Sequence, residues 1–168
     1  RGEPLTRAEI GVLLAYAKIV LFDELVASPL PDDPLFEADL FAYFPAQMRE
    51  KYAAEIRSHR LRREIIATEL ANDIINRGGP SFVTRLQDMT GRPAHEIVAA
   101  YAVIRDGFDL QSIFSTIDAL DNKLDGQVQL GLYERVARLI LTATAWQLKN
   151  GAGQGSIGER IRHLIEAR

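Results

Sequence analysis

The sequence predicts an all-α protein, built as a multi-helix bundle of about eight or nine helices with no sheet. Nearly every segment carries apolar residues at helical spacing, and no stretch alternates apolar and polar residues for more than a few positions, as a half-buried strand would. Helix-start and helix-stop signals also recur at short intervals. With 168 residues, of which 47% are hydrophobic and 26% charged, the chain has an ordinary globular composition that needs neither a disulfide nor a metal ion.

The first helix is expected to run from Thr6 to about Ala27. Residues 6–9 read Thr-Arg-Ala-Glu, a capping box in which Thr6 and Glu9 satisfy the free N–H groups of the first turn. The helix ends at residues 28–31, because proline disfavours helical geometry in the residue before it. Asp33 then caps a short helix that begins with Pro34. The expected apolar face of the first helix comprises Ile10, Leu13, Leu14, Ala17, Leu21 and Leu25.

A long helical pattern follows Pro45. Residues 46–77 could form one helix of about 48 Å at a rise of 1.5 Å per residue. Because a domain of this size has a diameter of only about 40 Å, we expect a break or bend near Ser58 and His59. Gly78-Gly79-Pro80 ends the pattern.

Further helices are expected over residues 81–90, 93–106, 110–120 and about 127–150, followed by a Gly-rich linker at residues 151–155. A second capping box, Ser156 with Glu159, starts a terminal helix. We therefore expect a helical bundle domain over residues 1–150, and a linker with a terminal helix over residues 151–168, packed on the rest of a parent chain or continuing into it. The expected core stripe of the 127–150 helix comprises Val128, Leu132, Val136, Leu139, Ala143 and Trp146.

Composition narrows the function classes. No apolar run approaches the roughly 20 residues of a membrane helix, and a net charge of −3 gives no reason to expect nucleic acid or an anionic membrane as partner. The absence of cysteine excludes a disulfide scaffold and a thiolate site, and fits the reducing cytoplasm. Because the chain begins with Arg1 rather than Met, we expect it to be a piece of a longer polypeptide.

No residue pattern indicates catalysis, cofactor binding or a metal site in this segment. Residues 151–158 read G-x-G-x-G-x-x-G, but a dinucleotide loop works between a strand and a helix, and here a long helix precedes the glycines. A linker is therefore the better interpretation. His59 and His163 each follow a glutamate by four residues, whereas a catalytic zinc site needs three protein ligands.

A dense basic cluster stands at the start of the 59–79 pattern. Positive charge near a helix N-terminus opposes the helix dipole, so a compensating partner is expected. The cluster could be a solvated face, or it could pair with acidic residues of this chain or of another domain. Phosphate or nucleic acid is a third possibility, disfavoured because no aromatic residues are interleaved. The cluster comprises Arg57, His59, Arg60, Arg62 and Arg63, and the acidic candidates are Asp32, Asp33, Glu37 and Asp39.

Two polar residues fall on the expected apolar stripe of the same helix. Thr68 and Asn72 share the register of Leu61, Ile65 and Ile75, so they are expected either to form a satisfied buried network or to mark a contact surface for another domain. The candidate interdomain contact residues are therefore Arg60, Arg62, Arg63, Thr68 and Asn72.

Four segments of this sequence resemble the sequences of a known protein family. They are LTRAEIGVLLAYAKIVLFDELVASPLPDDP, DLFAYFP, HRLRREIIATELANDIINRGGPSFVTRL and ALDNKL, in this order. Together they resemble the C-terminal helical region of the large bacterial NAD-dependent glutamate dehydrogenases, and the similarity covers most of residues 6–150.

The resemblance implies a parent oxidoreductase that converts L-glutamate, NAD and water to 2-oxoglutarate, ammonia and NADH in amino-acid catabolism. In that family the catalytic residues and the dinucleotide-binding domain lie upstream, so the resemblance assigns no catalytic residue here, and the segment alone is expected to be inactive. It implies a scaffold or assembly role, with the catalytic domain of the same chain as partner and a homo-oligomeric parent. The alternative is a free-standing helical binding module or regulator.

Overall fold

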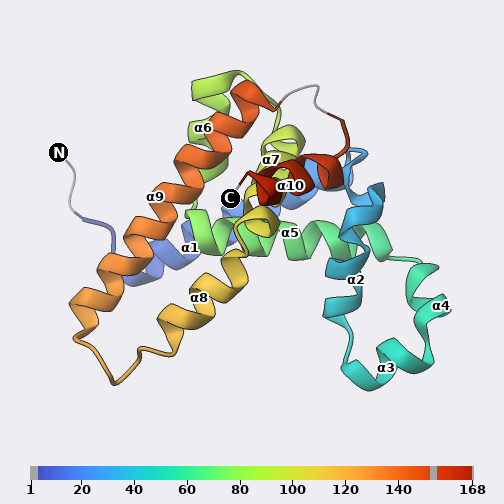
Figure 1. Cartoon of the computed structure of the whole chain (residues 1–168), viewed down its shortest axis with the longest axis horizontal. Helices are drawn as coiled ribbons and strands as arrows, with labels where there is room; N and C mark the ends of the chain where they lie inside the picture. Colours follow the sequence, from blue (N-terminus) through green and yellow to red (C-terminus); the bar gives the residue numbers. More distant parts are fainter. Residues whose placement is uncertain (1–3, 152–154, 168) are drawn as a thin grey trace. The chain divides into compact units, whose positions relative to one another are not determined.

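The computed structural model describes residues 4–151 and 155–167, and within these the protein is all-α. They contain ten α-helices and two short 3-10 helices and no strand (Figure 1). The predicted fold class is confirmed, while the helix count is slightly higher than expected because the 46–77 pattern is divided into three helices. The chain forms two compact units, residues 1–82 and residues 83–168. The proposed boundary between a domain at residues 1–150 and a tail at residues 151–168 stays a prediction.

In the first unit, most helix boundaries agree with those expected from the sequence. Its elements are α1 (Arg7–Val26), η1 (Leu30–Asp32), η2 (Pro34–Phe36), α2 (Glu37–Tyr43), α3 (Ala46–Lys51), α4 (Ala53–Arg57) and α5 (Arg62–Gly78). The predicted break near Ser58 is present, and a second one lies at Tyr52, whose backbone leaves the helical region. Helix α5 ends where Gly79 takes a φ of +86°, a conformation that glycine adopts without steric cost.

The core of this unit lies around α5, which packs against α1, η1 and α2. In Figure 1, α3 and α4 form an excursion beyond α2. The predicted capping box is present, since Glu9 N donates to Thr6 Oγ1 and Thr6 N donates to the Glu9 carboxylate. The largest fully buried side chains of this unit are Leu25, Phe36, Ile66, Leu70, Ile74 and Ile75.

Only the second half of α1 contributes to this core. Leu21 and Leu25 are buried as expected, whereas Ile10 and Leu13, predicted on the same face, are exposed. The helix is apolar on nearly all sides, so its sequence does not select one face, and the position of α5 decides which residues are covered. The exposed residues that we call the α1 apolar surface are Val12, Leu13, Tyr16, Ile19 and Val20.

The second unit is organised around α7. Its elements are α6 (Phe82–Thr90), α7 (Ala94–Gly107), α8 (Leu110–Asp118), α9 (Gly126–Asn150) and α10 (Ile157–Glu166), of which α6 begins at the last residue of the first unit. Helix α7 packs against α9 and α10 and is buried along almost its whole length, from Ile97 to Ile104. At its end Gly107 allows close approach of α10, because a Cβ there would lie 2.5 Å from Leu164 Cδ2. The predicted capping box of α10, Ser156 with Glu159, is present.

The expected core stripe of α9 is only partly covered, with Leu132, Val136 and Ala143 half-buried. Val128, Leu139 and Trp146 are exposed, Trp146 at 57% of its surface. Helix α9 has a second apolar face, and its contact with α7 selects that one. The residues that this contact buries are Ile140, Thr144, Ala145, Gln147 and Leu148.

Candidate functional site

Arg63, at the start of α5, forms hydrogen bonds with the backbone at the end of α1. Its Nη2 donates hydrogen bonds to the carbonyl oxygens of Val26 at 2.9 Å and Ser28 at 2.8 Å, and its Nη1 pairs with the carboxylate of Asp32. The last carbonyls of a helix lack partners within the helix, and the planar, multiply donating guanidinium can serve several of them at once. Arg63 therefore joins α1, η1 and α5.

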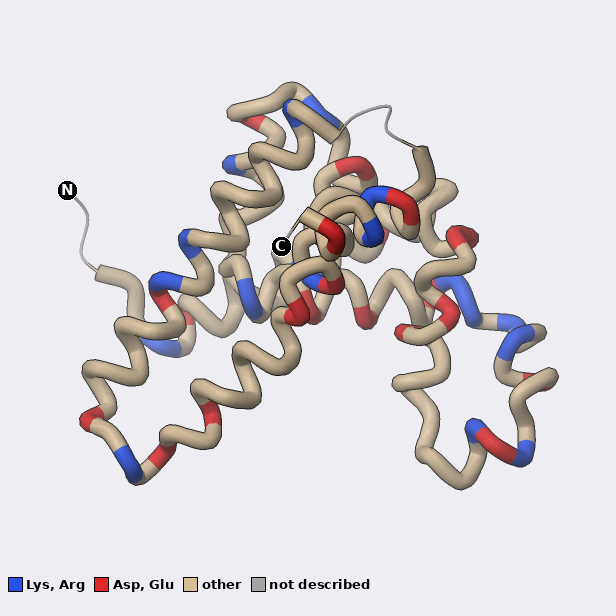
Figure 2. Tube along the Cα trace, viewed as in Figure 1, with Lys and Arg blue, Asp and Glu red and all other residues tan. Residues whose placement is uncertain are grey.

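The neighbouring arginines also meet acidic residues of this chain. Arg62 Nη2 lies 3.7 Å from Asp32 Oδ1, and Arg57 Nε donates to Glu37 Oε1 at 2.8 Å. Figure 2 shows these basic positions of the α4–α5 turn beside acidic positions in the stretch from η1 to α2. The expected acidic partners within the chain are thus confirmed for Asp32 and Glu37.

The remaining candidate residues have different surroundings. Arg60 is exposed, and its side chain forms no hydrogen bond or ion pair with another residue that the structure describes. Asp33 instead caps η2, accepting from Leu35 N at 2.9 Å. Whether Arg60, Arg62 and Arg63 contact another domain stays a prediction.

The expected buried network at Thr68 and Asn72 is wrong. Thr68 is exposed and its hydroxyl donates to Glu64 O within the same helix at 2.7 Å, while Asn72 is only half-buried. The predicted register included Leu61, which is 50% exposed and precedes the helix. The buried face of α5 is shifted by one residue from the predicted register. The reason is that α1 and α2 both pack against this shifted face. Its core positions are Ile66, Ala67, Leu70, Ala71, Ile74 and Ile75.

We predict that Arg63→Met destabilises the first unit by about 1–3 kcal/mol, because it leaves two backbone carbonyls and Asp32 without their donor. Urea denaturation followed by far-UV circular dichroism measures the change. Arg60→Met is the matched control, since Arg60 is exposed, and should stay within about 0.5 kcal/mol of the wild type. Equal losses of stability for the two substitutions would contradict the idea that Arg63 stabilises the contact between α5 and the end of α1.

Glu69, in α5, lies in an environment that disfavours its charged carboxylate. Partial burial raises its pKa, and the negative charges of Asp39 and Asp73 raise this pKa further. A carboxyl whose pKa is higher in the folded than in the unfolded state ionises first in the unfolded chain. The free energy of unfolding therefore falls as pH rises from the ordinary carboxyl range through the raised pKa.

We predict that Glu69→Gln makes the first unit modestly more stable at neutral pH, because the substitution removes this ionisation. The difference should disappear below the ordinary carboxyl pKa, where Glu69 is protonated in both states. Denaturation curves at pH 7 and at acidic pH test this, with the exposed Glu55→Gln as control. A Glu69→Gln protein less stable than the wild type at pH 7 would contradict the prediction.

Within the described residues, the histidines belong to no metal-binding group. His59 accepts from Leu61 N through Nδ1 at 3.2 Å and lies edge-on to Phe44. Within residues 4–151 and 155–167, no group of three or more His, Asp or Glu side chains is placed to hold a metal ion. Residues 152–154 of the Gly-rich segment lie outside the described residues. None of the described helices is long and apolar enough to cross a membrane.

Comparison with known proteins identifies the family. Residues 2–167 match the family model described as glutamate dehydrogenase, C-terminal. The chain is 39% identical over 163 residues to the NAD-specific glutamate dehydrogenase of Pseudomonas aeruginosa, and 40% identical over 155 residues to that of Halomonas elongata. It is 34% identical over 163 residues to the enzyme of the same name from Mycobacterium tuberculosis.

These similarities cover almost all of this chain but little of the relatives. They include 97%, 92% and 97% of the chain, respectively, and 10% of each relative. The chain thus spans about a tenth of the length of the curated relatives that it matches, and the resemblance of its four sequence phrases is confirmed. The family match over nearly every residue shows that this chain belongs to the glutamate dehydrogenase family, in its C-terminal part.

Proposed function

We propose that this chain is a non-catalytic scaffold segment at the C-terminal end of an NAD-dependent glutamate dehydrogenase. The parent polypeptide converts L-glutamate, NAD and water to 2-oxoglutarate, ammonia and NADH, and the rest of the parent supplies the catalytic residues and the NAD site. The support is the match to NAD-specific glutamate dehydrogenases, of which this chain corresponds to a tenth. The parent is proposed to be a cytoplasmic homo-oligomer.

The observation that carries the scaffold role is the α1 apolar surface. Tyr16 is 65% exposed, and Val12, Ile19 and Val20 are each more than half exposed. A contiguous apolar surface of this kind costs free energy in water and marks a contact with another protein surface. Because relatives of this chain are about ten times longer, the occupant we propose is another part of the same polypeptide.

A charge placed on this surface tests the proposal in the complete parent enzyme. Val20→Lys should leave the helicity of the 168-residue chain unchanged, because Val20 is exposed and lysine is a good helix former. In the parent it should lower NADH formation at least about tenfold or disrupt assembly, since a buried unpaired charge costs several kcal/mol. Absorbance at 340 nm and size-exclusion chromatography measure the two effects.

Met89→Lys is the matched control, because Met89 is also an exposed apolar residue on a helix, at 54%. Hydrogen exchange gives an independent measure: amides of α1 should be better protected in the parent than in the 168-residue chain. Unchanged activity and assembly of the Val20→Lys parent, with equal protection of α1 in both proteins, would overturn the scaffold proposal. Rapid NADH formation from glutamate by the 168-residue chain alone would overturn its non-catalytic character.

A further inference from the structure

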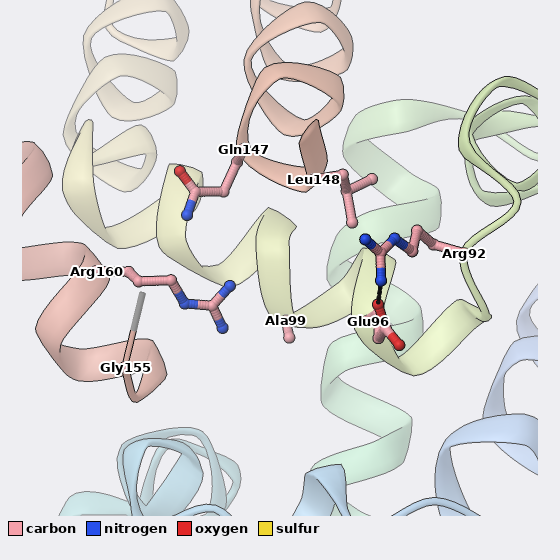
Figure 3. Close-up of a pocket in the computed structure, with 7 residues that line it drawn as sticks. All are labelled: Arg92, Glu96, Ala99, Gln147, Leu148, Gly155 and Arg160. Atoms are coloured by element: carbon pink, nitrogen blue, oxygen red, sulfur yellow. Dashed lines mark hydrogen bonds and ion pairs between the residues drawn. The ribbon is translucent and has the colours of Figure 1, made fainter. Parts of the chain in front are cut away.

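The side of α9 that faces away from α7 carries exposed apolar side chains. Gln147 and Leu148 line a pocket between α7, α9 and α10, and both are buried (Figure 3). Thr144, on the same inner side, is fully buried, whereas Trp146 is 57% exposed. Two residues correspond to about 200° around an α-helix, so Trp146 lies on the side opposite to Thr144. The fold of the second unit therefore uses the inner side of α9 and leaves the outer side open to solvent.

The residues on this outer side recur with the period of helix packing. They are separated by four and three positions in alternation, which is the spacing with which one helix packs along another. At 1.5 Å per residue, the row extends for about 27 Å, long enough to accommodate a partner helix. We call it the α9 outer surface, and it comprises Val128, Leu132, Arg135, Leu139, Thr142 and Trp146, all exposed except the half-buried Leu132.

Positive charge distinguishes this surface from the rest of the chain. Arg135 lies in the row, and Arg138 lies at its edge, one helical turn before Thr142. Both arginines are exposed, and neither side chain forms an ion pair or a hydrogen bond with another residue that the structure describes. Helix α9 has a single acidic residue, Glu134, although the chain as a whole has a net charge of −3. A surface with this combination favours a partner that carries apolar and acidic side chains.

The charge of the α9 outer surface disfavours a second copy of this chain as the occupant. If two α9 helices packed in register and antiparallel, Arg135 and Arg138 of both copies would meet near the middle of the contact. In a parallel pair, each arginine would lie beside the same arginine of the other copy. Both arrangements bring like charges together where water is excluded, which is costly.

We propose that the α9 outer surface binds an acidic amphipathic helix from the part of the parent polypeptide outside these 168 residues. The apolar side chains of that helix pack against Val128, Leu139 and Trp146, and its carboxylates pair with Arg135 and Arg138. The chain corresponds to 10% of each relative, so most of the parent sequence is available to supply such a helix. This inference rests on the proposed function and adds a second contact surface with the chemistry of its partner.

Hydroxyl-radical footprinting of the complete parent tests the proposal, because mass spectrometry measures the oxidation of individual side chains. Trp146 is the only tryptophan of this chain, and it is shielded in the wild-type parent if the surface is occupied. Arg135→Glu combined with Arg138→Glu should raise the oxidation rate of Trp146 at least about fivefold, because the partner's carboxylates then face carboxylates. Met89, an exposed residue of the same unit, should be oxidised at an unchanged rate.

Arg85→Glu combined with Arg162→Glu is the matched control. It makes the same change of charge at two exposed arginines elsewhere in the second unit, and should leave the oxidation of Trp146 as in the wild type. All four substituted arginines are exposed, so both variants are expected to fold, and the oxidation of Met89 checks this. Equal oxidation of Trp146 in the wild-type and Arg135→Glu/Arg138→Glu parents, or an equal increase in the control, would overturn the proposal.

Carbodiimide crosslinking identifies the partner segment, because it joins an amine to a neighbouring carboxylate. The Arg138→Lys parent keeps the positive charge and should form a crosslink from position 138 to an Asp or Glu outside these 168 residues. A crosslink to position 138 from a second copy of these residues would overturn the proposal. Because Trp146 reports on α9 and Val20→Lys tests α1, either of the two contact surfaces can fail while the other stands.

Discussion

Replacing Leu70 with alanine is expected to lower the free energy of unfolding of the first unit by about 2–5 kcal/mol. Leu70 is fully buried in the middle of α5, where α1 and α2 both pack. The substitution removes buried methyl groups and leaves a cavity, because neighbouring helices close in only partially. Urea denaturation monitored by far-UV circular dichroism gives the difference directly.

Leu61→Ala is the control for this prediction. Leu61 immediately precedes α5 and is 50% exposed, so its truncation should cost less than about 1 kcal/mol. The sequence pattern had placed Leu61 on the core face, and this pair of variants therefore tests the corrected register as well as the packing. A larger loss for Leu61→Ala than for Leu70→Ala would restore the register expected from sequence.

Gly107→Ala is expected to destabilise the second unit by about 1–3 kcal/mol, because the added methyl group overfills a packed contact. The new Cβ would lie 2.5 Å from Leu164 Cδ2 and 3.1 Å from Leu164 Cγ, so the Leu164 side chain, or α10 with it, must shift. Thermal and urea denaturation measure the loss, and hydrogen exchange should show that the amides of α10 become less protected first.

The same substitution at Gly131 should have the opposite sign. Gly131 lies within α9, and a Cβ there meets no atom within 4 Å. Since alanine favours a helix interior by about 1 kcal/mol over glycine, Gly131→Ala should stabilise the unit by up to this amount. Destabilisation by both substitutions would mean that close approach to Leu164 is not the cause at Gly107.

Local features of the fold were predictable because they depend on residues close together in sequence. The capping boxes of Thr6 with Glu9 and of Ser156 with Glu159 form as expected, since the two residues of each box are only three positions apart. The helix end at Gly79 also follows from a short-range backbone preference. The break near Ser58 was expected for another reason, because an unbroken helix would be longer than the domain is wide. Family membership was also recognisable from local sequence, because several short segments typical of the family occur in the same order.

The candidate site was only partly predictable. The basic cluster was expected to need acidic partners, and Asp32 and Glu37 supply them. Arg63 also donates hydrogen bonds to the carbonyl groups of Val26 and Ser28. These contacts depend on how α5 packs against the end of α1, and the charge pattern of the sequence does not predict that packing. The burial of Gln147 was not expected, because a single glutamine in an amphipathic helix reads as a surface residue until its burial is known.

The sequence by itself determined most helix boundaries, the all-α class and the family, but not the break at Tyr52. The tertiary structure decided which faces of those helices are buried. In α1 and α9 apolar residues extend around more than one face, and periodicity cannot choose between faces of similar hydrophobicity. The choice is made by packing against α5 and α7, which buries Leu25 and Ile140 and leaves Tyr16 and Trp146 in contact with solvent.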